Sequence, residues 1–294
     1  MKRLHLLIAL AAALVLSTSA WAQSYSFATV NNPNDPNDPF TQLLGINNSM
    51  VIAGYHNFFN NQGFVLNLPA HFTVENYPNS MMTQVIGINN SLTTSGFYVD
   101  NGGATHGFYH TNSGTFTTVD FPGTPFNQLL SQNDMQQAAG YYSLSSNNTT
   151  PDFPYVYDEV GGIFEVITIP GAVGGAQATG INNSGEVCGF FVDSAQVNHG
   201  WLLNAGVFLQ LDYPNSTFTQ ALGLNNHGQV VGQYMDNAGL THGFLYTVSS
   251  GRYITVDDPN GVGATVANGI NDNAMIVGFF GTAPINSGFV AMPH

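Results

Sequence analysis

The chain has 294 residues with 3 basic and 17 acidic side chains, a formal net charge of −14, and one cysteine, Cys188. Nucleic acids and anionic membrane surfaces both recruit Lys and Arg, so this composition excludes both as partners. A single cysteine also excludes a disulfide scaffold and a thiolate zinc site. Because 44% of the residues are hydrophobic, the chain can still build a sizeable core.

The N-terminus predicts export. Lys2 and Arg3 precede an apolar run over residues 6–16, and small residues follow up to Ala20-Trp21-Ala22. This order predicts a signal peptide over residues 1–22, and residues 23–294 then form a single mature domain. An uncleaved anchor helix is the alternative, but the apolar run is short for a bilayer. We therefore expect a secreted or periplasmic protein with no membrane insertion after cleavage. Arg252 is then its only basic residue.

Six internal repeats of about 45 residues follow one another in the mature chain. Each contains a variant of Gly-Ile-Asn-Asn, with a glycine seven residues after the first asparagine. The six asparagines are Asn47, Asn89, Asn133, Asn182, Asn225 and Asn271. The six glycines are Gly54, Gly96, Gly140, Gly189, Gly232 and Gly278. One aromatic column follows these glycines, at Phe64, Phe108, Tyr155, Trp201, Phe244 and Phe289. A second precedes each repeat, at Phe27, Phe72, Phe116, Phe164, Phe208 and Tyr253.

Each repeat holds four strand-like runs, which in the fifth repeat are residues 221–224, 230–234, 243–247 and 253–256. Asn-Asn and Gly between the first two runs favour a tight turn, which we take to explain the asparagine column. Four strands per repeat predict an all-β, six-bladed β-propeller with four antiparallel strands per blade. The last repeat ends after its third strand, so the strand at residues 26–30 is predicted to complete the last blade and close the ring. An open β-solenoid is the alternative, but the sequence lacks its polar caps.

The best-preserved repeats resemble a known family. Gly223 to Tyr234 followed by His242-Gly243-Phe244, and Gly180 to Phe191 followed by His199-Gly200-Trp201, resemble the bacterial extracellular HAF repeats. His106-Gly107-Phe108 is a third instance, and all three carry Gly where the family motif has Ala. The resemblance covers nearly the whole mature chain. It implies export and a repeat architecture, and it implies no particular reaction.

Three repeats share an Asp-x5-His spacing. The pairs are Asp100 with His106, Asp193 with His199, and Asp236 with His242. A carboxylate and an imidazole at this spacing are candidates for a metal site or an acid–base pair. Repetition in three blades favours a structural role, because catalytic sites normally use unequal residues. A second acidic column, at Asp120, Asp212 and Asp257, precedes or lies next to a proline-containing turn; turn capping is the favoured role, and calcium is the alternative.

A column of glutamines is the best candidate for ligand binding. Its members are Gln42, Gln84, Gln128, Gln177 and Gln220, with Val266 in the sixth repeat. On the propeller model they lie where the inner strands enter the central channel, and a ring of amides there suits sugar hydroxyls or peptide groups. The alternative, which we favour, is that each amide hydrogen-bonds the backbone of the neighbouring blade.

The predicted function is a binding or scaffolding module for a neutral glycan or a protein. We expect a monomer, and we assign no cofactor and no catalytic residue. One alternative is a polysaccharide hydrolase or lyase with carboxylates at the channel mouth. Its acids would come from the irregular third repeat, which contains Asp134, Asp152, Asp158 and Glu159, and from Glu165 just after it. The other alternative is a structural envelope protein stabilised by calcium.

Overall fold

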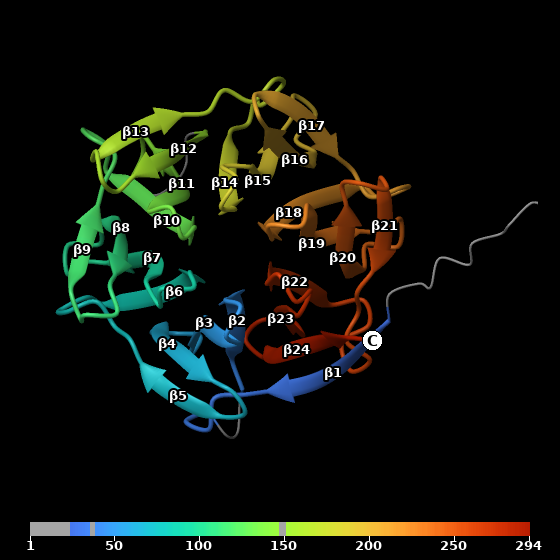
Figure 1. Cartoon of the computed structure of the whole chain (residues 1–294), viewed down its shortest axis with the longest axis horizontal. Coiled ribbons are helices and arrows are strands. Elements are labelled where there is room, and N and C mark those ends of the chain that lie inside the picture. The colour runs from blue at the N-terminus through green and yellow to red at the C-terminus, as the bar shows by residue number, and fades with distance from the viewer. Residues whose placement is uncertain (1–23, 36–38, 147–150) are drawn as a thin grey trace, which may run out of the picture.

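A computed structural model describes residues 24–35, 39–146 and 151–294, so the predicted signal peptide lies outside the described residues. The described residues form 24 strands and no helix. Accordingly, they include no helix of the length and hydrophobicity needed to cross a membrane. The sheets are arranged in a ring around a central axis (Figure 1), which confirms the predicted all-β propeller.

Each sheet is built from strands that follow one another in the chain. The first sheet contains β2 (Thr41–Ile46), β3 (Val51–His56), β4 (Gln62–Asn67) and β5 (His71–Val74). The largest contains β6 (Met82–Ile88), β7 (Thr94–Val99), β8 (Thr105–His110), β9 (Phe116–Val119), β10 (Phe126–Gln132), β11 (Gln137–Ser143), β12 (Asp152–Asp158) and β13 (Ile163–Val166). The third sheet contains β14 (Ala176–Ile181), β15 (Val187–Val192), β16 (Asn198–Asn204) and β17 (Val207–Leu211). The fourth sheet contains β18 (Phe218–Leu224), β19 (Gln229–Met235), β20 (Thr241–Thr247) and β21 (Arg252–Thr255). The last contains β22 (Thr265–Ile270), β23 (Ile276–Phe280), β24 (Ser287–Pro293) and β1 (Tyr25–Val30).

The hydrogen-bonding pattern differs from six separate four-stranded blades. Four sheets have four strands, whereas the second and third repeats share one sheet of eight strands. A parallel bridge between Thr105 of β8 and Phe126 of β10 joins them. Within this sheet each repeat keeps its own antiparallel set, β6–β9 and β10–β13. The eight-stranded sheet therefore arises from a single bridge between two neighbouring four-stranded units.

The first and last parts of the described chain lie together in one sheet. β1 pairs antiparallel with β24, from Tyr25 opposite Pro293 to Val30 opposite Gly288. The ring of Phe27 lies 5.6 Å from that of Phe289, which packs the N-terminal strand against the core of the last repeat. The N-terminal strand thus supplies the outer strand of the last sheet.

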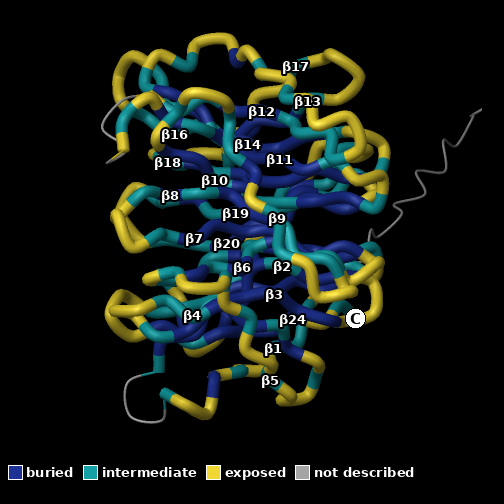
Figure 2. Tube along the Cα trace, turned by 90° about the vertical axis from the view of Figure 1, so that its left-hand side faces the viewer, coloured by how far each residue is buried: buried dark blue, intermediate teal, exposed yellow. Residues whose placement is uncertain are grey.

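The core lies between neighbouring sheets, and buried residues follow the stacked inner strands while turns are exposed (Figure 2). The aromatic residue of each third strand is fully buried and lies directly opposite the glycine that recurs in each second strand, as Trp201 lies opposite Gly189. A Cβ on Gly189 would lie 2.7 Å from the Trp201 ring and 1.9 Å from the carbonyl oxygen of Gln177. Glycine recurs at this position because no side chain fits there.

Candidate functional site

Three adjoining cavities lie along the axis of the ring, lined by the innermost strands β2, β6, β10, β14, β18 and β22. These strands all start at the glutamine column and end before the asparagine column, so the two ends of the channel differ chemically. The cavity at the glutamine end, here called the mouth, has a volume of about 310 Å³. The middle cavity has about 110 Å³ and the cavity at the asparagine end about 70 Å³.

The mouth combines amides with aromatic rings. Four of the predicted glutamines line it, Gln42, Gln84, Gln128 and Gln177. Gln220 does not line the mouth. Its side-chain oxygen accepts a hydrogen bond of 2.7 Å from Gln233, and Gln233 does line the mouth. The rings of Tyr55, Phe97, Phe190 and Phe279 complete the wall. These aromatic residues directly follow the glycine column, a regularity that sequence analysis had missed.

The glutamines link neighbouring repeats through side chains. Each of four Nε2 atoms donates to a residue at the start of the third strand of the preceding repeat. The bonds are Gln42 to Asn286 at 3.0 Å, Gln84 to Asn61 at 2.7 Å, Gln177 to Asp152 at 2.6 Å, and Gln220 to Asn198 at 3.0 Å. The acceptors are side chains, so the expected bonding to backbone groups is wrong. An amide has two N–H donors, so Gln42 and Gln84 each keep one for a ligand.

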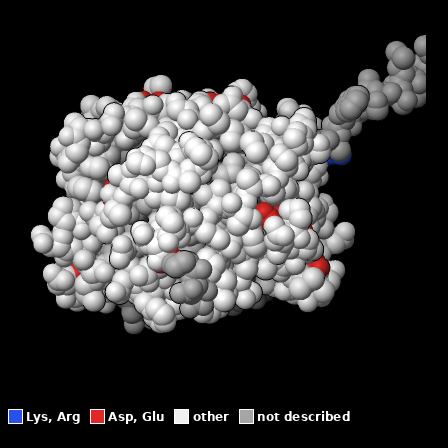
Figure 3. Space-filling model, turned by 90° about the horizontal axis from the view of Figure 1, so that it is seen from below, with Lys and Arg blue, Asp and Glu red and all other residues white. Residues whose placement is uncertain are grey.

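The mouth has no ionisable carboxylate, ammonium, guanidinium or imidazole group among the described residues that line it. Of the third-repeat acids, Asp152 is bonded to Gln177, while Asp158, Glu159 and Glu165 belong to the region of β12 and β13. Burial, with the nearby charge of Asp158, raises the pKa of Glu159 to about 7. The structure does not gather these acids around one cavity. Charged side chains are also sparse on the face shown in Figure 3.

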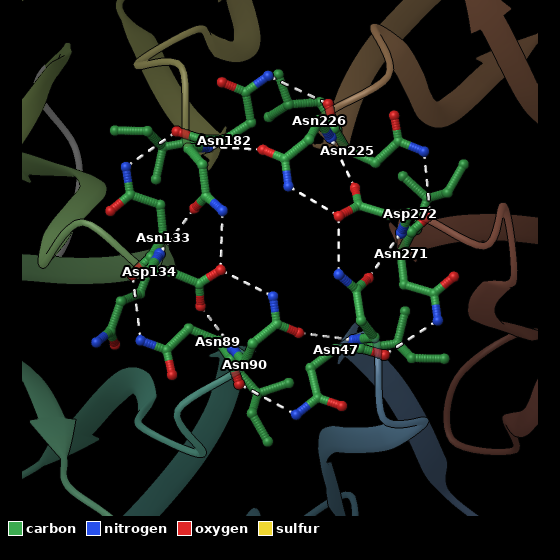
Figure 4. Close-up of a pocket in the computed structure, with 18 residues that line it drawn as sticks. Asn47, Asn89, Asn90, Asn133, Asp134, Asn182, Asn225, Asn226, Asn271 and Asp272 are labelled. Atoms are coloured by element: carbon green, nitrogen blue, oxygen red, sulfur yellow. Dashed lines mark hydrogen bonds between the residues drawn. The ribbon is translucent and has the colours of Figure 1, made fainter.

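The narrow end is encircled by a cycle of asparagines (Figure 4). Nδ2 of each donates to the carbonyl oxygen of its counterpart in the next repeat, at 2.9 to 3.1 Å, in the order Asn47, Asn89, Asn133, Asn182, Asn225, Asn271 and back to Asn47. The same residues also form their own turns, since Oδ1 of Asn47 accepts from the backbone of Ser49 and Val51. Turn formation is therefore confirmed, but it explains only part of this column.

A second cycle lies inside the first, nearer the axis of the ring (Figure 4). The residue after each ring asparagine accepts, through Oδ1, a backbone N–H from the preceding repeat at 2.7 to 2.9 Å. Two members are carboxylates: Asp134 accepts two asparagine amides and Asp272 accepts two others. Burial works against the charge of Asp272, but the hydrogen bonds from Asn226 and Asn48 lower its pKa overall. The polar groups at this end hydrogen-bond to one another, so the mouth is the end of the channel that is better suited to a ligand.

The Asp–His pairs belong to larger clusters. Each histidine lies between the predicted aspartate and a member of the second acidic column. Nδ1 of His242 lies 2.7 Å from Asp257 and Nε2 lies 3.5 Å from Asp236. His106 lies between Asp120 and Asp100, and His199 between Asp212 and Asp193, in the same way. Asp236 also accepts backbone N–H groups of its own loop, which lower its pKa. Among the described residues, no three such side chains are arranged to hold a metal ion.

These clusters predict how stability depends on pH. Burial lowers the pKa of His242, but the hydrogen bonds and charges of Asp257 and Asp236 outweigh it and raise the pKa overall; Asp212 and Asp193 do the same for His199. A raised folded-state pKa stabilises the fold below the ordinary histidine pKa of about 6.5, and this stabilisation is lost as pH rises through the folded-state value. We therefore expect His242→Gln to flatten the fall in unfolding free energy as the pH rises above about 6.5.

Urea unfolding at a series of pH values measures this slope. His71→Gln is the matched control, because His71 is exposed and takes part in no such cluster. Equal slopes in the wild type and in His242→Gln would contradict the expected linkage.

Comparisons with known proteins bear on the fold. No family model matches the sequence, and no curated protein does. TolB from Acinetobacter baumannii is similar in structure, with a TM-score of 0.58 and 10% identity over 81% of this chain and 63% of that one, so this chain matches less than two thirds of its length. A putative TolB from Agrobacterium tumefaciens has a TM-score of 0.57 and 10% identity, over 80% of this chain and 88% of that one. A mutant Aleuria aurantia lectin in complex with Fucα1-6GlcNAc has a TM-score of 0.54 and 9% identity, over 92% of this chain and 94% of that one. At these identities, the likeness establishes a β-propeller and nothing more specific.

Proposed function

We propose that this protein is a binding module whose channel mouth takes up an uncharged ligand, a segment of neutral glycan. One observation carries the proposal: the mouth of about 310 Å³ is lined by amides and aromatic rings, with no charged side chain among the described residues. Ligand sites typically combine such apolar walls with a few fixed polar groups. The lectin in complex with Fucα1-6GlcNAc, which has a similar fold, supports a glycan over other neutral ligands.

The glutamine amides are already held in place. Their bonds to Asn286, Asn61 and Asp152 restrict their rotamers before a ligand arrives, which reduces the entropy lost on binding. The half-buried rings of Phe190 and Phe279 offer flat surfaces to the apolar face of a sugar, while the second N–H groups of Gln42 and Gln84 suit its hydroxyls.

The proposal also includes the number of blades and the location of the protein. We count the eight-stranded sheet as two blades, because the asparagine cycle has six members, and take β1 as the strand that completes the sixth. The export pattern of residues 1–22 and the HAF-like repeats support a secreted or periplasmic location.

A glycan array and polysaccharide pull-down on the mature protein, with calcium and with chelator, test the proposal. We expect a neutral glycan to bind and to remain intact. Phe190→Ala combined with Phe279→Ala should weaken binding by about tenfold or more. Phe59→Ala is the control, since that ring is 85% exposed and outside the mouth lining.

Three results would count against it. Shortened polymer would favour the hydrolase or lyase alternative. Unchanged binding by the double variant would move the site away from the mouth. Melting that depends on calcium, without glycan binding, would favour the structural envelope protein.

A further inference from the structure

The first and second repeats meet around a polar cluster where the other repeats use hydrophobic side chains. Oε2 of Glu75 lies 3.2 Å from Nδ1 of His110, and Thr94 donates its hydroxyl hydrogen to Oε1. The side chain of Glu75 is 10% exposed and that of His110 is 20% exposed, while Thr94 is buried. The cluster joins the end of β5 to β7 and β8, and so spans two repeats.

The repeat alignment shows that all three residues are exceptions. The positions equivalent to Glu75 hold Val30, Val119, Ile167, Leu211 and Val256. Those equivalent to Thr94 hold Ile52, Ala138, Val187, Val230 and Ile276. Those equivalent to His110 hold Leu66, Tyr157, Leu203, Tyr246 and Ala291. The fold thus needs no acid, hydroxyl or imidazole at these places, and a buried charge pair is usually less stable than hydrophobic residues of similar size. Such departures from local stability are typical of functional sites.

Glu75 and His110 of this cluster form the floor of a cavity. This cavity has a volume of about 220 Å³ and shares no lining residue with the mouth. Val51, Val65 and Ile88 give it apolar walls. Its rim carries the exposed side chains of Asn67 and Asn112. A buried polar floor, apolar walls and an open amide rim are the composition of a small-molecule site.

The polar contacts decide which ligand chemistry fits. Nδ1 of His110 lies against Oε2 of Glu75, so Nε2 on the other side of the ring is the atom available to a ligand. The charge of Glu75 is already engaged by His110 and Thr94, and the other polar groups of the lining are amides and hydroxyls. A ligand hydroxyl would hydrogen-bond Nε2 while the rim amides bond further hydroxyls. The volume lies below the ~300 Å³ at which pockets for drug-sized ligands begin, which suits a single ring.

We propose that the cavity between the first and second repeats is a second binding site, independent of the mouth, for one neutral monosaccharide-sized polyol. Glu75 orients His110, and Nε2 of His110 hydrogen-bonds a hydroxyl group of the ligand. No bond in the ligand is formed or broken.

The test titrates methyl glycosides of glucose, galactose, mannose and N-acetylglucosamine into the full mature chain. Binding is followed by saturation-transfer NMR and by the ring resonances of histidines labelled with ¹⁵N. We expect at least one glycoside to bind and to shift the Nε2 resonance of His110. The key variant, Glu75→Val with Thr94→Val and His110→Leu, restores residue types that the other repeats carry. It should melt about 5 °C higher than the wild type and lose the glycoside signal.

Two controls keep the result specific. The mouth variant Phe190→Ala with Phe279→Ala should still bind the glycoside with unchanged affinity, which separates this site from the proposed function of the mouth. Methylamine should not bind. Absence of binding by every glycoside, equal binding by the triple variant, or binding of methylamine in place of the glycosides would each overturn the proposal.

Discussion

Replacing Gly189 with alanine is expected to lower the free energy of unfolding by about 3 kcal/mol or more. The added Cβ would lie 1.9 Å from the Gln177 carbonyl oxygen, which belongs to the neighbouring strand, and 2.7 Å from the fully buried Trp201 ring. Relief requires either separating β14 from β15 or moving the largest core side chain of that repeat. Both responses lose packing or ladder hydrogen bonds that the fold cannot replace locally.

Urea unfolding followed by tryptophan fluorescence measures this effect, because Trp201 itself reports on the packing around Gly189. Gly102→Ala is the matched control. The nearest atom to its added Cβ is a carboxylate oxygen of Asp100, 3.2 Å away on an exposed turn, so we expect a change within about 0.5 kcal/mol. A Gly189→Ala protein as stable as the control would show that the close approach of strand and ring is not what fixes this column.

Replacing Asn47 with alanine is expected to cost about 3 kcal/mol. The side chain donates one hydrogen bond to the carbonyl oxygen of Asn89 and accepts two from the backbone of Ser49 and Val51, and each such bond contributes roughly 1 kcal/mol net. The loss also leaves buried backbone groups without partners. Thermal and urea unfolding of the variant measure the cost.

Asn47→Asp separates the two roles of this residue. The carboxylate keeps both acceptor bonds of the turn but cannot donate to Asn89, so we expect it to lose only the link between repeats. Asn60→Ala, on an exposed loop, serves as the control. Equal stability of Asn47→Asp and the wild type would mean that the cycle of asparagines adds nothing beyond the turns.

The sequence predicts the propeller because its signals are local and repeated. The glycine and aromatic columns recur in every repeat. Within a hairpin, their spacing along the chain determines that the glycine of one strand lies opposite the aromatic residue of the next. The Asp–His pairs lie six residues apart and are brought together as expected, although the second aspartate on each histidine was assigned to a separate column. Its participation depends on where β9, β17 and β21 end against the neighbouring strand.

Contacts between repeats were harder to predict. The glutamines bond side chains of the preceding repeat, and the asparagines bond carbonyl groups of the next one. Both depend on how closely the ring brings two units together, which spacing within one repeat does not encode. The Glu75 cluster is different, because a signal was present: one acid in a column of five aliphatic residues. Comparing the columns for exceptions, and not only for agreement, would have found it.

The inner cycle at the narrow end reads Asn48, Asn90, Asp134 and then Asn183, Asn226, Asp272. A rotation by three units therefore maps amide onto amide and carboxylate onto carboxylate. Each half of the ring carries one acid and presents at either end the groups that the other half requires. A chain of only three units would thus have self-complementary ends, and two copies would rebuild the same cycle as a symmetric dimer. The placement of two carboxylates makes this propeller divisible, and it offers a natural point at which to split the molecule into exchangeable halves.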